Sequence, residues 1–175
     1  MSSKAVQFMK IGLGAGLLGL FTTTAADAAT ATANLGVSAT VSSNCSISTS
    51  PVAFGSYDPV GTNAATPLDT AGTVTVTCTS GASTTITLGQ GGNAGGGSTD
   101  ASPVRRMRDS GSAYLSYALY QDASRMTTWG NTSGTGVNHT GTGSSSNISV
   151  YGRVAAGQNV ASGSYSDTVV ATITF

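Results

Sequence analysis

A strictly alternating stretch, residues 29–41, constrains the fold of this chain more than any other part of its sequence. Every odd-numbered residue from Ala29 to Val41 is apolar, and every even-numbered residue from Thr30 to Thr40 is Thr, Asn, Gly or Ser. A period of two is typical of a β-strand with one face against a core. Its first ten residues would extend about 33 Å at roughly 3.3 Å per residue, the length of a β-sandwich. Because the stretch has no hairpin signal, it needs a partner strand elsewhere.

An export signal precedes this stretch. Lys4 and Lys10 come before an apolar run at residues 11–21, and a region of small residues ends at Ala28. The apolar run is well short of the roughly 20 residues that a transmembrane helix requires. We therefore predict a signal peptide at residues 1–28, so that the alternating stretch becomes the free N-terminus of an exported chain.

The composition after residue 28 indicates one β-rich domain with little net charge. The remaining 147 residues contain five Arg, six Asp and neither Lys nor Glu. A net charge near −1 provides no electrostatic footprint for nucleic acid or anionic lipid. Thr, Ser, Gly, Ala and Val dominate, which favours strands and turns over helices. We expect a single all-β domain without a nucleic-acid partner.

Cys45 and Cys78 are the only cysteines. An exported chain meets an oxidising compartment, so a disulfide between them is favoured over two unpaired buried thiols. In the chain-entropy model such a loop closure is worth about 3 to 4 kcal/mol. Two Cys and one His cannot fill the four ligand positions of a structural metal site, and we expect no cofactor.

Runs that alternate in polarity or are rich in β-branched and aromatic residues continue to the end of the chain. In the last of them, Val169, Ala171, Ile173 and Phe175 face one way, and no further strand follows. About seven strands with one disulfide fit an immunoglobulin-like β-sandwich. The expected strands are residues 51–57, 72–79, 84–88, 104–108, 113–121, 147–154 and 165–175.

The segments between these strands carry weak functional signals. Residues 89–98 are glycine-rich but lack the Lys-Ser or Lys-Thr of a phosphate-binding loop, which predicts a flexible connector. Residues 104–108 should form a strand with exposed arginines, paired with Asp109 or Asp122. His139, the only histidine, lies in the loop 130–146 without a Gly-x-Ser-x-Gly motif, so a secreted hydrolase is not favoured.

The final strand and the alternating stretch complement each other. An uncovered apolar strand edge is an aggregation site unless something pairs with it. The alternating stretch could fold back into its own groove, or insert into the groove of the next copy and build a linear fibre. The predicted fold is therefore an incomplete immunoglobulin-like β-sandwich that lacks its last strand and is completed by a donor strand.

Eight short motifs, in order over nearly the whole exported chain, carry a resemblance to a known family. They are Cys45-Ser-Ile, Phe54-Gly-Ser-Tyr-Asp58, Val74-Thr-Val-Thr-Cys-Thr79, Arg105-Arg-Met, Leu115-Ser-Tyr-Ala-Leu-Tyr-Gln-Asp122, Trp129-Gly130, Val150-Tyr-Gly-Arg-Val154 and Gly163-Ser-Tyr-Ser-Asp-Thr-Val169. On these residues the chain resembles the spore coat protein U domain family, which includes major subunits of archaic, Csu-type chaperone-usher pili.

The resemblance implies a structural subunit and no enzyme. A periplasmic chaperone would fill the groove temporarily, an outer-membrane usher would secrete the subunit, and other copies and minor or tip subunits would follow in a surface pilus for adhesion and biofilm formation. Residues 29–38 would be the donor strand and residues 39–175 the domain, with residues 37–41 running on into its first strand. The inserting residues would be Ala29, Ala31, Ala33, Leu35 and Val37, and the chaperone or acceptor groove would involve Val169, Ala171, Ile173 and Phe175.

A second hypothesis stays open beside the pilus subunit. The chain could complete itself and act as a monomeric spore-coat or cell-surface binding protein that uses Trp129 and exposed tyrosines. The two hypotheses differ in whether the alternating stretch enters its own groove or that of another copy. A single 147-residue domain has no room for the additional receptor-binding domain of a tip adhesin, which favours a rod subunit.

Overall fold

The computed structural model describes residues 27–175 and divides the chain into two units at Ala39 and Thr40. The predicted signal peptide lies outside the described residues except for its last two. In the first unit, residues 27–39 form no helix or strand and are all exposed. The prediction that residues 37–41 belong to the first strand of the domain is wrong, because that strand begins only at Cys45.

The second unit is a sandwich of two antiparallel β-sheets, which confirms the predicted all-β, immunoglobulin-like fold. The described residues contain no α-helix, only the short 3-10 turn η1 (Thr62–Ala64). The five-stranded sheet has the order β1 (Cys45–Ser50), β2 (Leu68–Cys78), β7 (Ser145–Val154), β5 (Tyr114–Tyr120) and β4 (Arg105–Arg108). The three-stranded sheet has the order β6 (Val137–Thr140), β3 (Ser83–Leu88) and β8 (Ala171–Thr174).

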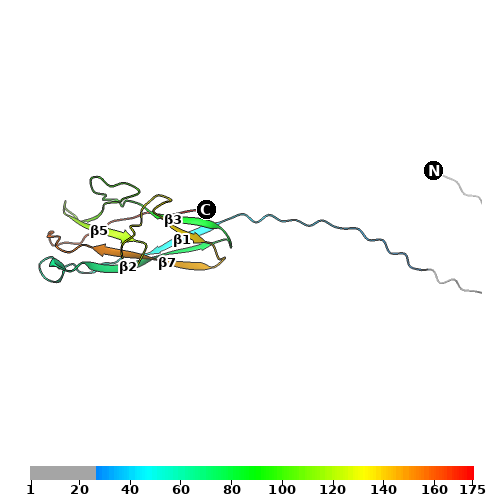
Figure 1. The fold of residues 1–175 in the computed structure, drawn as a ribbon, viewed down its shortest axis with the longest axis horizontal. Helices are drawn as coiled ribbons and strands as arrows, with labels where there is room; N and C mark the ends of the chain where they lie inside the picture. The colour runs from blue at the N-terminus through cyan, green and yellow to red at the C-terminus, as the bar shows by residue number, and fades with distance from the viewer. Residues whose placement is uncertain (1–26) are drawn as a thin grey trace, which may run out of the picture. The chain divides into compact units, whose positions relative to one another are not determined.

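The long pair β2 and β7 forms the middle of the five-stranded sheet and runs side by side along the domain in Figure 1. The pairing extends from Leu68 opposite Val154 to Thr77 opposite Ser145. Alternate residues of β2 face inward, as its sequence pattern predicts, and the threonines between them face outward. This register brings the β-branched side chains of the two strands together on one face of the sheet.

Trp129 lies at the centre of the core and is fully buried. Its indole Nε1 donates a hydrogen bond of 2.9 Å to the carbonyl oxygen of Ile86, so the ring joins β3 to the other sheet without an unpaired polar group. The buried core consists of Val74, Val76, Ile86, Leu88, Leu119, Trp129 and Val150.

Three expected elements differ in the structure. Residues 51–57 are not assigned as a strand, because they make no main-chain ladder. The loop 130–146 contains β6, whose four residues are too few to reveal a period of two. The last strand, expected from residue 165, is assigned only from Ala171, since the residues before it make isolated pairings with β4 and with the glycine-rich loop.

Candidate functional site

A groove of about 1130 Å³ opens along one side of the sandwich. We call residues 49–60 its N-terminal wall and residues 159–171 its C-terminal wall. β1 and β8 are edge strands, each with a hydrogen-bonded neighbour on one side only, so the two sheets do not join along this side. The floor is formed by core side chains, namely Val74, Leu88, Leu115, Leu119, Val150 and Val154.

The C-terminal wall presents unpaired main-chain groups to the groove. The carbonyls of Ser166, Thr168 and Val170 accept hydrogen bonds of 2.9 to 3.0 Å from the body of the domain. Successive residues of an extended chain direct their main-chain groups to opposite sides, so those of Asp167 and Val169 point the other way. Within residues 27–175, the main-chain N–H and C=O of these two residues have no hydrogen-bond partner. This edge can therefore accept another strand.

The N-terminal wall lies against the sheet through side chains. Val52 and Phe54 are half-buried, and both pack over Gly152 of β7. A Cβ on Gly152 would lie 2.6 Å from Val52 Cγ1 and 2.9 Å from Phe54 Cζ, which explains why a strand interior carries glycine here. At the far end, the Tyr57 hydroxyl donates to the carbonyl of Ala155 at 2.9 Å.

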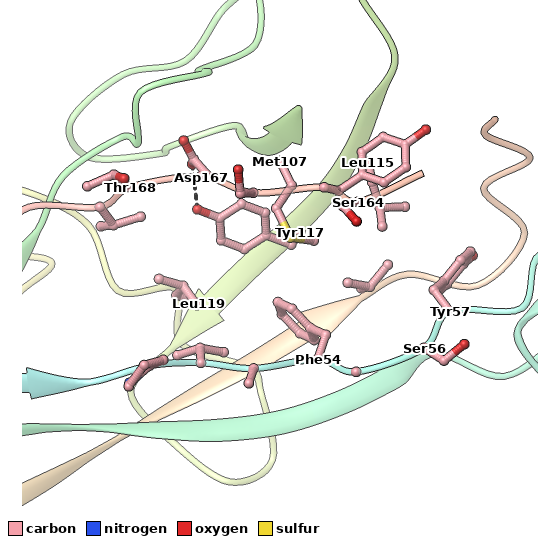
Figure 2. Close-up of a pocket in the computed structure, with 18 of the residues that line it drawn as sticks. Phe54, Ser56, Tyr57, Met107, Leu115, Tyr117, Leu119, Ser164, Asp167 and Thr168 are labelled. Carbon is pink, nitrogen blue, oxygen red and sulfur yellow. Dashed lines mark hydrogen bonds between the residues drawn. The ribbon is translucent and has the colours of Figure 1, made fainter. Parts of the chain in front are cut away.

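Phe54 of the N-terminal wall and Asp167 of the C-terminal wall both contact Tyr117 of β5, as Figure 2 shows. The rings of Phe54 and Tyr117 meet edge to face with centroids 6.0 Å apart. The Tyr117 hydroxyl donates a 2.6 Å hydrogen bond to Asp167 Oδ2. Burial, followed by this hydrogen bond, raises the pKa of Tyr117 well above its ordinary value, so the phenol stays neutral. Above its apolar floor the groove thus contains a fixed hydrogen bond between Tyr117 and Asp167.

Arg105 corrects the prediction of exposed arginines on β4. Its side chain is buried, and it donates to the carbonyls of Gly89, Leu88 and Trp129, each at 2.8 Å. Burial lowers its pKa to about 10, while Tyr117 and Asp167 oppose that shift. Arg105 remains charged at neutral pH and holds the ends of two loops together, and it forms no ion pair with Asp109 or Asp122.

The four residues predicted for the acceptor groove lie in three different environments. Val169 and Ala171 line the groove, and Ile173 packs against the core from β8. Phe175 is 55% exposed beyond the end of that strand. Phe54, Tyr117 and Asp167 were not predicted as site residues, although the alternation of Tyr165, Asp167, Val169 and Ala171 indicates that Asp167 faces inward.

The predicted donor residues lie in the first unit. Ala29, Ala31, Ala33, Leu35 and Val37 are all exposed, Leu35 and Val37 at 88% each. Single exposed apolar residues are common on proteins, but a continuous alternating row of them is not. Residues 27–39 therefore carry an alternating apolar row that no other residue of 27–39 covers.

The predicted disulfide is present. Cys45 and Cys78 are bonded and face each other in the register of β1 and β2. The bond fixes β1 to the sheet just before the N-terminal wall begins.

The remaining sequence signals show no catalytic arrangement. His139 lies on β6, where its main-chain carbonyl accepts a hydrogen bond from the Thr84 hydroxyl. In residues 27–175, no three His, Cys, Asp or Glu side chains come close enough together to bind a metal ion. The same residues include no helix with the length and apolarity needed to cross a membrane.

The fold of the domain resembles that of a known structure. A solved chain of the CsuC–CsuE chaperone-tip adhesion subunit pre-assembly complex, from the archaic chaperone-usher Csu pili of Acinetobacter baumannii, shares the fold with a TM-score of 0.52 and 20% identity. The match covers 78% of this chain but only 40% of that one. The fold is thus an immunoglobulin-like sandwich that this chain shares with a chain of that complex.

The family is shown by the sequence itself. The Spore Coat Protein U domain matches residues 31–172, and the chain belongs to this family. Protein U of Myxococcus xanthus is 52% identical over 157 residues, which cover 86% of this chain and 88% of that protein.

Proposed function

We propose that this protein is an exported structural subunit that polymerises into surface fibres by inserting residues 29–38 into the groove of another copy. The observation that carries the proposal is the groove whose C-terminal wall leaves Asp167 and Val169 without main-chain partners. An inserted strand would satisfy these groups and cover the apolar floor. The sandwich would then be complete.

The segment 29–38 suits this groove in its pattern of polarity. Ten extended residues span about 33 Å, and one face of them is apolar throughout. The segment has no charged side chain, so after cleavage at Ala28 only the α-amino group of Ala29, at the very end of the inserted strand, carries a charge. Leu35 is the only large inserting side chain, and we assign it to the deepest part of the floor.

The assembly partners follow from the family and fold. A periplasmic chaperone would cover the groove before assembly, and an outer-membrane usher would pass the subunit to the growing fibre. Such a fibre would serve adhesion and biofilm formation at the cell surface, with this protein as a rod subunit. Cleavage after Ala28 would expose the donor segment.

Deletion of residues 29–38 tests the proposal. We expect the exported chain that begins at Ala29 to form ladders on a denaturing gel without boiling, and the chain that begins at Ala39 to run as a monomer. A synthetic peptide of residues 29–38 should bind the shortened chain and raise its thermal midpoint. Ladders from the shortened chain would refute strand exchange through this segment.

A self-complemented coat protein is the second candidate, and membership in a family described by its spore coat domain favours it. In this case the chain from Ala29 would purify as a stable, monodisperse monomer without any chaperone. Analytical ultracentrifugation of that chain separates the two candidates.

A further inference from the structure

The glycine-rich loop, residues 89–98, is not the flexible connector that its composition predicts. Its main chain is hydrogen-bonded along the C-terminal wall of the groove. The Gly89 N–H donates to the Val170 carbonyl at 2.9 Å, and the Gly92 N–H donates to the Thr168 carbonyl at 3.0 Å. The loop therefore takes the place of a neighbouring strand for the part of the wall that precedes β8.

Within this loop, residues 91–93 enclose the carboxylate of Asp167. The Asn93 main-chain N–H and its Nδ2 donate to Asp167 Oδ1 at 3.2 and 3.1 Å. A Cβ on Gly92 would lie 3.5 Å from the same oxygen. Gly91 has φ +88°, and a Cβ there would collide with Oδ2. Only glycine permits the main chain to approach the carboxylate so closely with this conformation.

Two further contacts fix the carboxylate and the loop to the sheet. Tyr117 on β5 donates to the second oxygen of Asp167 at 2.6 Å. On the other side, Arg106 of β4 donates to the carbonyls of Asn93 and Ala94 at 3.1 and 2.9 Å, and its guanidinium lies 4.0 Å from the ring centre of Tyr114. Asp167 is thus held from the floor of the groove and from the loop at once.

Asp167 is also the one charged residue in the inward-facing row of this wall. Its neighbours in the row are Tyr165, Val169 and Ala171. An inward-pointing charge on an edge strand opposes pairing of that edge with arbitrary strands of other chains. Because such a charge is partly buried, it requires hydrogen-bond partners of its own. Here the partners are supplied by the loop and by Tyr117, so the wall stays extended with its main-chain groups directed into the groove.

We infer that residues 91–93, Tyr117 and Asp167 form a clasp that holds the acceptor wall in register before the donor strand arrives. Asp167 is a positioning residue: it does not contact the donor main chain through its carboxylate, but it fixes the edge with which that strand pairs. The inference rests on the proposed function, since it concerns the capture of residues 29–38 by this groove. Without the clasp, the wall must be ordered during capture, which slows the reaction.

The test uses the exported chain from Ala29 and measures the initial rate of ladder formation. Asp167→Ala and Gly91→Ala should each slow it about tenfold, the effect of losing a hydrogen bond to a charged group. Gly97→Ala is the matched control, because Gly97 also has a positive φ of +78° but nothing within 4 Å of the added Cβ. Thermal unfolding and the Cys45–Cys78 disulfide report whether each variant folds.

A double variant separates the clasp from a general loss of stability. In the Asp167→Ala background the collision partner of residue 91 is gone, so Gly91→Ala should slow assembly no more than Gly97→Ala does in that background. If Gly91→Ala and Gly97→Ala form ladders at equal initial rates in the wild-type background, the clasp is refuted. This comparison does not need Asp167→Ala, so it still tests the clasp if that variant fails to fold. A wild-type chain that forms no ladders would instead refute the proposed function.

Discussion

Three arginines in this domain donate mainly to main-chain carbonyl oxygens, which belong to loops and, for Arg125, also to the paired strands β2 and β7. Arg105 binds three of them, Arg106 binds two, and Arg125 binds those of Ala123, Gly152 and Thr70. A guanidinium offers five N–H donors in a fixed plane, so it can join several loop ends that lack a ladder partner. In a fold that consists largely of loops and short strands, these side chains replace part of the missing regular hydrogen bonding.

Substitution of Arg105 tests this at the residue scale. Arg105→Leu leaves three buried carbonyls without a donor, and we expect the free energy of unfolding to fall by about 3 kcal/mol or more. Arg108→Leu is the control, since the exposed side chain of Arg108 donates to the carbonyl of Gly111 alone among the described residues, and its effect should stay within about 0.5 kcal/mol. Urea denaturation measures both. If the free energy of unfolding falls by a similar amount in both variants, the buried hydrogen bonds of Arg105 do not stabilise the domain more than the exposed one of Arg108.

The sequence could not reveal the role of these arginines. A run such as Arg105, Arg106, Met107 and Arg108 alternates as a strand does, but its charges suggest solvent on both faces. Which arginine is buried depends on the carbonyls of residues 88, 89 and 129, which are brought together only by the fold. The inward position of Asp167 was accessible from the alternation of the last strand, whereas its partners in the glycine-rich loop were not.

At the scale of elements, the two walls of the groove share one property: each contains a stretch, residues 51–57 and residues 165–170, that lacks a full ladder. Alternation predicts which face of such a segment is buried, and it did so for Val169 and Ala171. It cannot predict whether a neighbour pairs with the segment, because pairing depends on residues distant in sequence. Residues 51–57 and 165–170 were therefore predicted as strands, although their pairing along the groove is absent in residues 27–175.

Gly152 provides a test of the N-terminal wall. In Gly152→Ala the new Cβ meets Val52 and Phe54, so these side chains must shift toward the groove. We expect a loss of about 1 to 3 kcal/mol in unfolding free energy from overpacking, together with weaker capture of the peptide of residues 29–38. Gly134→Ala, with nothing within 4 Å of the added Cβ, should change neither quantity. Unchanged peptide binding in Gly152→Ala would show that this wall does not shape the acceptor groove.

For the molecule as a whole, an open groove and an uncovered apolar segment occur in the same chain. A chain with five arginines and six aspartates after residue 28 has little net charge to keep copies apart. An open sheet edge is a liability in a free monomer. In the strand exchange that we propose, insertion of a strand from another copy would remove this liability and leave a new donor segment at the end of the fibre, so that the fibre would grow by repetition of one contact.

Leu35 allows the donor role to be separated from the acceptor role. Leu35→Asp places a charge on the inserting face, and burial of an unpaired carboxylate should weaken polymerisation more than any other single change in residues 29–38. Asn34→Asp is the matched control, because it adds the same charge one residue away on the opposite face of the strand.

A Leu35→Asp chain keeps its groove, so when mixed with wild-type subunits it should still accept a donor strand and then terminate the fibre. Fibre lengths in electron micrographs should fall as its fraction rises, whereas Asn34→Asp should leave them unchanged; equal lengths for the two mixtures would place the inserting face elsewhere.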